Sequence, residues 1–410
     1  MDTVDNLFEP ARHEPLGAAS WDEGTARAWI ARYAEDAQST FSPTELWPAH
    51  PRDLEGEDDG SPFAMVYFGA AGVIGALDHL ARAGAVGPCA RFAPIVDELP
   101  ARNAAMVEQW GHGTEGLLMG RSGILLLRYR LARDCATAGA TADAIADSIA
   151  ANSRHPSLEL LWGSPSTMHA ALTMHEWTGE ERWAELFRAD ADALLRAFLP
   201  ADDAACRFWT QDLYGKKTRY IGAGHGFAGN ASALIRGREL LPPSVWAECA
   251  DGVVATTHAL AQREGPLANW PPMLLPPGST ASKVLVQWCH GAPGIVTSLA
   301  GLPDPRLDDL LVGAGELTWT AGPLTKGAGL CHGTAGNGYA FLKLFRRMSD
   351  PRWLERARAF AMHAIAQSDR MANEHGRRRH SLWTGDAGVA CYVWGCVTGD
   401  AALPNLDPTA

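Results

Sequence analysis

A short glycine motif, Gly-x-x-Gly, recurs along most of this 410-residue chain. Six intact copies begin at Gly69, Gly120, Gly226, Gly291, Gly333 and Gly385. A seventh, degenerate copy reads Gly163-Ser164-Pro165-Ser166. The first and last copies are six intervals apart, so the spacing averages roughly 53 residues, which is enough for two helices and their loops. This self-similarity indicates a repeat architecture built from a two-helix unit.

The sixth unit shows what each unit contains. After Gly336, apolar residues recur at helical spacing and predict an inner helix. Asp350-Pro351 then supplies an N-cap acceptor and a proline at the first helical position, and an amphipathic helix follows. The same restart occurs at Asp304-Pro305, and Thr178 with Glu181 is typical of a capping box.

Strand-like alternation is scarce, so the sequence predicts an all-α fold. Seven helix pairs without a long hydrophilic linker predict one closed α/α toroid, a double ring of seven inner and seven outer helices. An open solenoid is the alternative, but it would need polar capping repeats that the sequence lacks. We expect residues 1–60 to pack on the toroid, residues 61–400 to form it, and residues 401–410 to be a tail.

Net charge and the distribution of apolar residues limit which classes of partner the protein can bind. The formal net charge is −12 at pH 7, which disfavours a nucleic-acid surface or an anionic membrane surface as a partner. The sequence shows no apolar signal core at Met1 and no run of 18 apolar residues, so we expect a cytoplasmic protein without a membrane segment. Eight cysteines without a CxxC pair would stay mostly reduced there.

Two of these cysteines stand out because each is followed directly by His and Gly. Cys289-His290 and Cys331-His332 precede equivalent glycines of adjacent units, so their side chains should meet at the mouth of the ring. Thiolate and imidazole suit Zn²⁺, and three protein ligands with an open fourth position are typical of a catalytic site. The pattern predicts a zinc site but does not by itself choose between the two histidines.

The stretches around these residues resemble the lanthionine synthetase C-like (LanC-like) family, especially its stand-alone branch. Residues 287–294 read QWCHGAPG, and residues 326–337 read KGAGLCHGTAGN. Gly215-Lys216, followed by YIGAGHG at residues 220–226, is similar to a third family element. With the seven glycine motifs, the resemblance spans roughly residues 60 to 400.

The resemblance implies a double ring of helices with zinc held by Cys289, Cys331 and His332, and with His290 as a neighbour rather than a ligand. It also implies an enzyme that adds a thiol to dehydroalanine or dehydrobutyrine in a dehydrated peptide and so forms a thioether. The thiol is a cysteine of the same peptide in bacterial cyclases and glutathione in eukaryotic relatives. By the same comparison Lys326, and Arg378 among the three arginines at 377–379, match cations of the thiol site.

The addition of a thiol to a dehydrated residue also requires a proton donor. A free thiol is mostly protonated at pH 7, and a metal deprotonates it. Attack on the β-carbon leaves an enolate that needs a proton, and His225, in a Gly-His-Gly turn, is the predicted donor. A positive group near the substrate carbonyl would stabilise the enolate, so Lys326 and Arg378 are also predicted catalytic residues. Bacterial cyclases carry an aspartate where this chain has Gly116, and the adjacent Glu115 is a candidate substitute. His112 nearby is expected to be a loop residue.

Three functions remain open from the sequence. Gly215-Lys216, Lys326 and the missing aspartate favour addition of glutathione or another small thiol, with Lys216, Lys326 and Arg378 as its binding residues. A cyclase acting on a dedicated precursor peptide is the alternative. A non-catalytic scaffold or receptor that binds zinc and thiols is the alternative from another class, and intact Cys289, Cys331, His332 and His225 argue against it. A terpene cyclase or glycosidase toroid would leave the Cys-His pairs unexplained.

Overall fold

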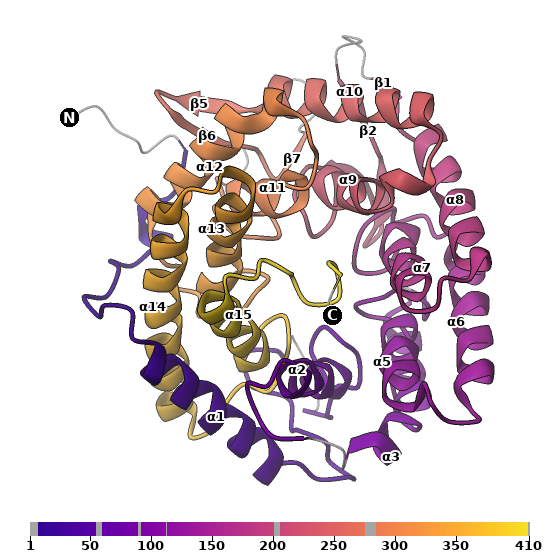
Figure 1. Ribbon diagram of the computed structural model, residues 1–410, viewed down its shortest axis with the longest axis vertical. Helices are drawn as coiled ribbons and strands as arrows, with labels where there is room; N and C mark the ends of the chain where they lie inside the picture. The colour runs from indigo at the N-terminus through magenta and orange to yellow at the C-terminus, as the bar shows by residue number, and fades with distance from the viewer. Residues whose placement is uncertain are drawn as a thin grey trace.

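The computed structural model describes residues 7–54, 60–88, 92–111, 113–200, 206–274 and 284–408. It consists of two concentric rings of helices (Figure 1). The helices of the inner ring follow the seven motifs: α2 (Ala70–Arg82), α5 (Ser122–Ala132), α7 (Ser164–Thr178), α9 (Phe227–Arg236), α11 (Ala292–Leu299), α13 (Thr334–Met348) and α15 (Asp386–Thr398). The predicted all-α toroid is confirmed.

The outer ring surrounds these helices. It consists of α1 (Glu23–Ser39), the short α3 (Ala93–Val96), α6 (Ala138–Asn152), α8 (Glu181–Arg196), α10 (Pro243–Leu260), α12 (Asp308–Ala321) and α14 (Pro351–His375). An additional helix, α4 (Leu99–Trp110), contacts α3 and α5. Three 3₁₀ turns complete the described helices: η2 (Pro10–Arg12), η4 (Arg238–Leu240) and η5 (Pro305–Leu307). None of the helices described is both long and apolar enough to cross a membrane.

The second glycine of each intact motif allows the loop before an inner helix to fold back on that helix. A Cβ at any of these six glycines would lie 1.7 to 2.2 Å from the carbonyl oxygen of the residue six positions earlier. Contacts that close do not occur for a real Cβ, so only glycine fits. The affected residues are Gly72, Gly123, Gly229, Gly294, Gly336 and Gly388.

The outer helices begin as the sequence predicts in two units and differently in a third. The Asp350 side chain accepts a hydrogen bond from the Arg352 amide at the start of α14, and Asp304 caps η5 in the same way. The capping box predicted for α8 is wrong. The N-cap of α8 is Glu180, and the Thr178 hydroxyl instead donates to the Met174 carbonyl within α7.

The chain closes the toroid by returning its first helix to its last. Helix α1 packs on α15 and α14, so it supplies the outer partner of the last inner helix (Figure 1). The buried Trp29 of α1 donates its indole N–H to Asp369 of α14. Before α1, the carboxylate of Glu14 accepts hydrogen bonds from Gln367 and Arg370 of α14.

A belt of backbone hydrogen bonds joins the units at the motif end of the inner ring. We call the residue two places before each first glycine the belt position; the seven are Tyr67, Leu118, Leu161, Gly224, Cys289, Cys331 and Trp383. Five of these residues donate an amide hydrogen to the carbonyl of the next belt position, at 2.8 to 3.2 Å: Gly224, Cys289, Cys331, Trp383 and Tyr67. The belt therefore fixes the spacing of adjacent units.

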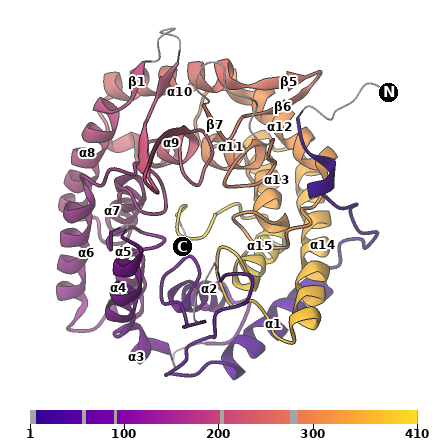
Figure 2. The same ribbon diagram turned by 180° about the vertical axis from the view of Figure 1, so that it is seen from behind.

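In the part of the chain that the structure describes, seven short strands lie between the helices, and each pair is antiparallel. They are β1 (Leu199–Pro200), β2 (Arg207–Phe208), β3 (Gln211–Leu213), β4 (Lys216–Tyr220), β5 (Gln262–Glu264), β6 (Leu267–Asn269) and β7 (Met273–Leu274). Strands β3 and β4 form a hairpin with Gln211 opposite Thr218, and β4 also pairs with β7. This hairpin lies beside α9, near the central opening (Figure 2).

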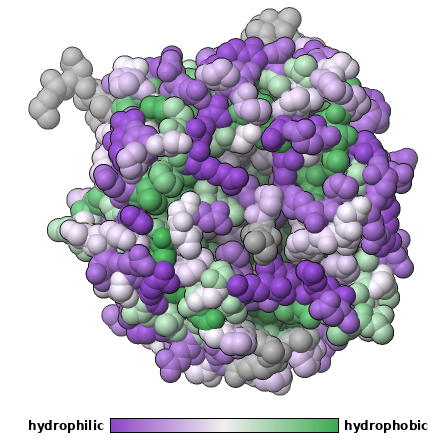
Figure 3. Space-filling model, in the orientation of Figure 1, coloured by the Kyte–Doolittle hydropathy of each residue, from purple (hydrophilic) through white to green (hydrophobic). Residues whose placement is uncertain are grey.

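At the opposite end of the inner ring, residues 401–408 cover the central opening (Figure 1). The Asp407 carboxylate pairs there with Lys343 of α13 at 2.7 Å. Hydrophilic side chains gather around the centre of this face (Figure 3). The motif end and the covered end are therefore chemically distinct mouths of one toroid.

Candidate metal centre

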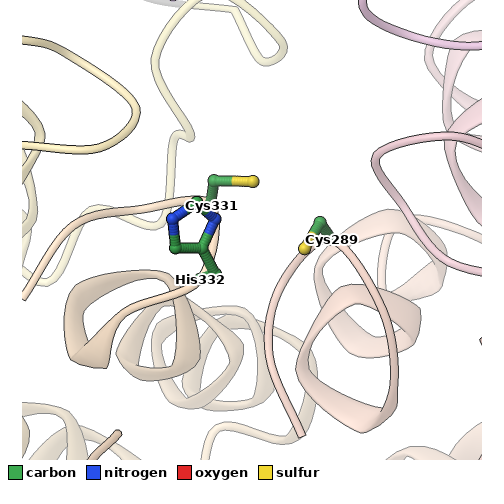
Figure 4. Close-up of side chains that lie close together, drawn as sticks. All are labelled: Cys289, Cys331 and His332. Carbon is green, nitrogen blue, oxygen red and sulfur yellow. The ribbon is translucent and has the colours of Figure 1, made fainter. Parts of the chain in front are cut away.

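Two cysteines and one histidine converge at the motif end. Ligand atoms of Cys289, Cys331 and His332 lie within 4.8 Å of one another, and this is the only such cluster among the residues described. Cys331 and His332 come from the loop before α13, and Cys289 comes from the loop before α11 (Figure 4). The Cys289 amide donates to the Cys331 carbonyl at 3.0 Å, so the belt itself brings the two thiols together.

The thiols share a buried, polar environment. Cys289 is 6% exposed and Cys331 is 5% exposed. Hydrogen bonding by the Cys331 thiol, and then by His332, holds the pKa of Cys289 well below its ordinary value, although burial opposes this. The same contact, together with burial, raises the pKa of Cys331. The pair thus favours one thiolate, which is the state that binds a metal.

The donor set fits zinc. Two sulfurs and one imidazole are ligands that Zn²⁺ prefers, and a tetrahedral ion held by three of them keeps one position open. The Gln287 amide donates to the Cys289 sulfur at 3.0 Å, and the Arg12 guanidinium donates to Gln287 at 3.4 Å. These contacts orient the sulfur from outside the ligand set.

His225 lies beside this cluster with an acidic partner that the sequence did not reveal. Its ring centroid is 5.9 Å from that of His290, which follows Cys289. Its Nδ1 lies 3.0 Å from a carboxylate oxygen of Glu159, whose side chain is fully buried. Burial alone would lower the pKa of His225, but the hydrogen bond and charge of Glu159 raise it. A protonated imidazole is therefore favoured.

Glu159 lies at one of the two interruptions of the belt, between the third and fourth units. The Leu161 amide does not continue the pattern to Gly224; it donates to Glu159 at 3.0 Å, and the Trp162 amide donates to the other carboxylate oxygen at 2.6 Å. One carboxylate oxygen of Glu159 thus accepts hydrogen bonds from both the Leu161 amide and the His225 Nδ1. The backbone amides that do not continue the belt at this interruption hold the Glu159 carboxylate instead.

A buried carboxylate that pairs with His225 thus comes from Glu159, one unit after Gly116. Glu115 instead binds Arg121 and Ser148. Gly116 and Glu159 both stand four residues before a first glycine, in the second and third units. The sequence signal that could have revealed Glu159 is its place four residues before Gly163, the first residue of the degenerate third motif. His112 lies outside the described residues.

The predicted cations occupy three different places. Lys326 is exposed beside the metal cluster, where its charge favours the Cys331 thiolate, and its carbonyl accepts a hydrogen bond from Arg52 at 2.7 Å. Lys216 is exposed on β4. Arg378 is bound by Asp369 at 2.9 Å and by Asp386 at 3.5 Å. The structure thus brings Lys326 to the cluster and holds Arg378 between carboxylates.

Known proteins resemble this chain in sequence and fold. Residues 63–407 match the family model of lanthionine synthetase C-like proteins. A zebrafish (Danio rerio) protein named glutathione S-transferase LANCL1 is 36% identical over 157 residues, 35% of this chain and 34% of the relative. The Arabidopsis thaliana LanC-like protein GCL1 is 30% identical over 263 residues, 61% of this chain and 58% of the relative. The first match thus spans about a third of the zebrafish protein's length, and the second spans less than three fifths of the Arabidopsis protein's length.

A solved structure shares the whole architecture. Nisin cyclase superimposes with a TM-score of 0.62 at 14% identity, covering 91% of this chain and 93% of that chain. At this identity the likeness shows the fold, which agrees with the two rings of helices described above. The family model covers most of the toroid and both metal-ligand loops. The chain belongs to the lanthionine synthetase C-like family.

Proposed function

We propose that this protein is a zinc-dependent enzyme that adds a thiol to dehydroalanine or dehydrobutyrine residues of peptides and so forms a thioether. The observation that carries the proposal is the three-ligand cluster of Cys289, Cys331 and His332 next to the His225–Glu159 pair. A cluster with an open ligand position can activate a thiol, and a protonated imidazole can complete the addition. A scaffold would have no need for the buried acid.

The metal ligands, His225 and Glu159 would each have a separate role in the reaction. Bound zinc would supply a thiolate nucleophile at neutral pH. Sulfur forms a bond to the β-carbon, and the electron pair of the double bond moves to the α-carbon and its carbonyl. His225 holds its Nδ1 proton toward Glu159, so Nε2 is the atom that gives a proton to the α-carbon. Glu159 keeps the imidazole oriented and charged until that transfer.

Glutathione or a similar small thiol is the thiol that the charges favour. Arg12 and Arg52, with Lys326, lie beside the fifth and sixth units, where the metal ligands are. Glutathione brings two carboxylates with its thiol, and fixed cations pair with carboxylates. The name of the zebrafish relative agrees with this choice. Lys216 and Arg378 stay predictions as thiol-binding residues, since Arg378 would have to leave Asp369 and Asp386 to bind one.

Thiol addition can be tested directly. A dehydroalanine-containing peptide is incubated with purified protein, zinc and glutathione, and mass spectrometry should detect the mass of one added glutathione. Cys331→Ala should abolish the product, and Lys326→Ala should raise the KM for glutathione at least ~10-fold, or ~1.4 kcal/mol, but not the KM for a neutral thiol. Closure of rings in peptides that carry both cysteine and dehydroalanine, without glutathione addition, would establish the cyclase alternative.

The cellular setting follows from the same chemistry. Cysteines that bind a metal and a free thiol substrate both need a reducing compartment. We therefore keep the cytoplasm as the proposed location. The acceptor would be a dehydrated peptide, and nothing in the proposed chemistry calls for nucleic acid or a membrane.

A further inference from the structure

The mouth around the metal cluster has two chemically different halves. We call the residue directly before each first glycine the rim position, since all seven lie next to the belt; they are Phe68, Met119, Trp162, His225, His290, His332 and Thr384. Units four to six carry imidazoles there. Units one to three carry only apolar side chains. Met119 and Trp162 are buried and Phe68 is partly exposed, so this half of the mouth is apolar in character.

The tip of the β3–β4 hairpin extends this apolar surface beside His225. Tyr214 and Gly215 form the turn, and both have positive φ, 52° and 71°. Turns of this kind favour asparagine or glycine, and a bulky residue in the left-handed region costs ~1 kcal/mol or more. Tyr214 is nevertheless 48% exposed, which leaves its ring facing solvent. An exposed, strained aromatic residue at a site is a sign of function.

The Tyr214 ring is held in place by the third unit. Its hydroxyl accepts a hydrogen bond from the Trp162 indole at 3.3 Å, and its ring centroid is 6.1 Å from that of His225, nearly perpendicular at 77°. The ring centroid of Tyr220 also lies 5.9 Å from that of His225. The proposed proton donor thus has two aromatic rings close by, and that of Tyr214 is exposed.

Further rings continue from Trp162 to the first unit. Trp110 contacts Trp162 and Phe63 with centroid distances of 6.3 Å each, and Phe63 lies 5.4 Å from Phe68. Trp110 and Phe68 are partly exposed. We call the accessible rings of this row, Tyr214, Trp110 and Phe68, the aromatic shelf; Trp162 and Phe63 are buried and support them. The cations Lys326, Arg12 and Arg52 lie beside units five and six instead.

We propose that the aromatic shelf binds the acceptor peptide and selects peptides with an apolar side chain next to the dehydrated residue. The inference rests on the proposed function. Cations beside the metal suit the charged thiol, whereas the acceptor contributes a neutral double bond that must lie between sulfur and His225. Its flanking residue then falls on the shelf, where burying an apolar side chain contributes ~1.5–3 kcal/mol.

Two peptides that differ at one residue test the proposal. Both carry one dehydroalanine, followed by Phe in one and by Glu in the other, and kcat/KM for glutathione addition is measured for each. The wild type should prefer the Phe peptide at least ~10-fold, or ~1.4 kcal/mol. Tyr214→Asn removes the ring while suiting the left-handed turn, so it should bring the ratio close to one without lowering the Tm. Tyr214→Phe should keep most of the preference.

Leu199→Ala is the matched control, because Leu199 is also an exposed apolar residue, 59% exposed, on β1. It should keep the wild-type ratio. Equal kcat/KM values for the two peptides in the wild type, or an unchanged ratio in Tyr214→Asn, would overturn the inference. If no thiol is added to either peptide, the proposed function fails. Fluorescence anisotropy with labelled peptides that carry alanine for dehydroalanine then decides whether the shelf still prefers Phe.

Discussion

At the scale of single residues, the His225–Glu159 pair is the feature that most limits the chemistry. A neutral imidazole could not give a proton to the α-carbon, and a buried imidazole is normally neutral near pH 7. Glu159 reverses that tendency by raising the pKa of His225. In the proposed reaction the Cys289–Cys331–His332 cluster would prepare the nucleophile, and protonated His225 would complete the addition.

The pH dependence of the reaction should report this pair. The donor works in its protonated form, so kcat should fall as the pH rises through the pKa of His225. Glu159→Gln removes the charge that raises this pKa, and the fall should move to lower pH. Glu115→Gln, which changes a carboxylate paired with Arg121, is the control and should leave the profile in place. An unmoved profile in Glu159→Gln would remove His225 from the proton transfer.

The sequence predicted the cysteines and histidines of the site because each stands at a fixed place in a repeat. Glu159 was not predicted, although it has the same place in the third unit that Gly116 has in the second. Its role depends on a gap between the third and fourth units that no local pattern shows. Arg378 illustrates the same limit, since its partners Asp369 and Asp386 come from two different helices.

At the scale of elements, the loop before each inner helix is the recurring device. The second glycine lets a carbonyl approach the helix, and the first glycine caps the helix in six of the seven units. Helix pairs could be predicted because this device repeats. The β3–β4 hairpin could not, because strands of three and five residues give almost no periodic signal.

Replacing one second glycine should therefore damage the whole unit. In Gly336→Ala the new Cβ would lie 1.7 Å from the Leu330 carbonyl oxygen, so the loop that carries Cys331 must move. We expect a loss of at least ~3 kcal/mol in the free energy of unfolding, measured by denaturation, together with weaker zinc binding. Gly139→Ala in α6 meets nothing within 4 Å and should change stability by less than ~1 kcal/mol. Equal stabilities of the two variants would contradict this account of the motif.

At the scale of the whole molecule, backbone hydrogen bonds and α1 close the ring. The belt joins Gly224 to Leu118 through four other units, and α1 covers α15. The sequence predicted a closed ring from the number of units. It did not predict that the seventh outer helix comes from the first residues of the chain, since that pairing joins segments more than 300 residues apart.

Zinc removal should therefore leave the toroid folded. We expect about one zinc per chain in the purified protein, and chelation should leave the far-ultraviolet circular dichroism unchanged while lowering the Tm by only a few degrees. Zinc fingers, which lack a large core, unfold without metal. Loss of the helical signal on chelation would show that the ion holds the ring together.

The belt places seven residues in equivalent positions around the inner ring, yet only two adjacent ones are cysteines. The repetition therefore belongs to the backbone, and the proposed catalysis would depend on the side chains that differ between units. Because the candidate metal ligands come from two adjacent units, the two proposed substrates would approach them from different sectors of the ring. Within such a scaffold, a change of chemistry needs no new fold; it needs a different choice of which sectors carry which side chains.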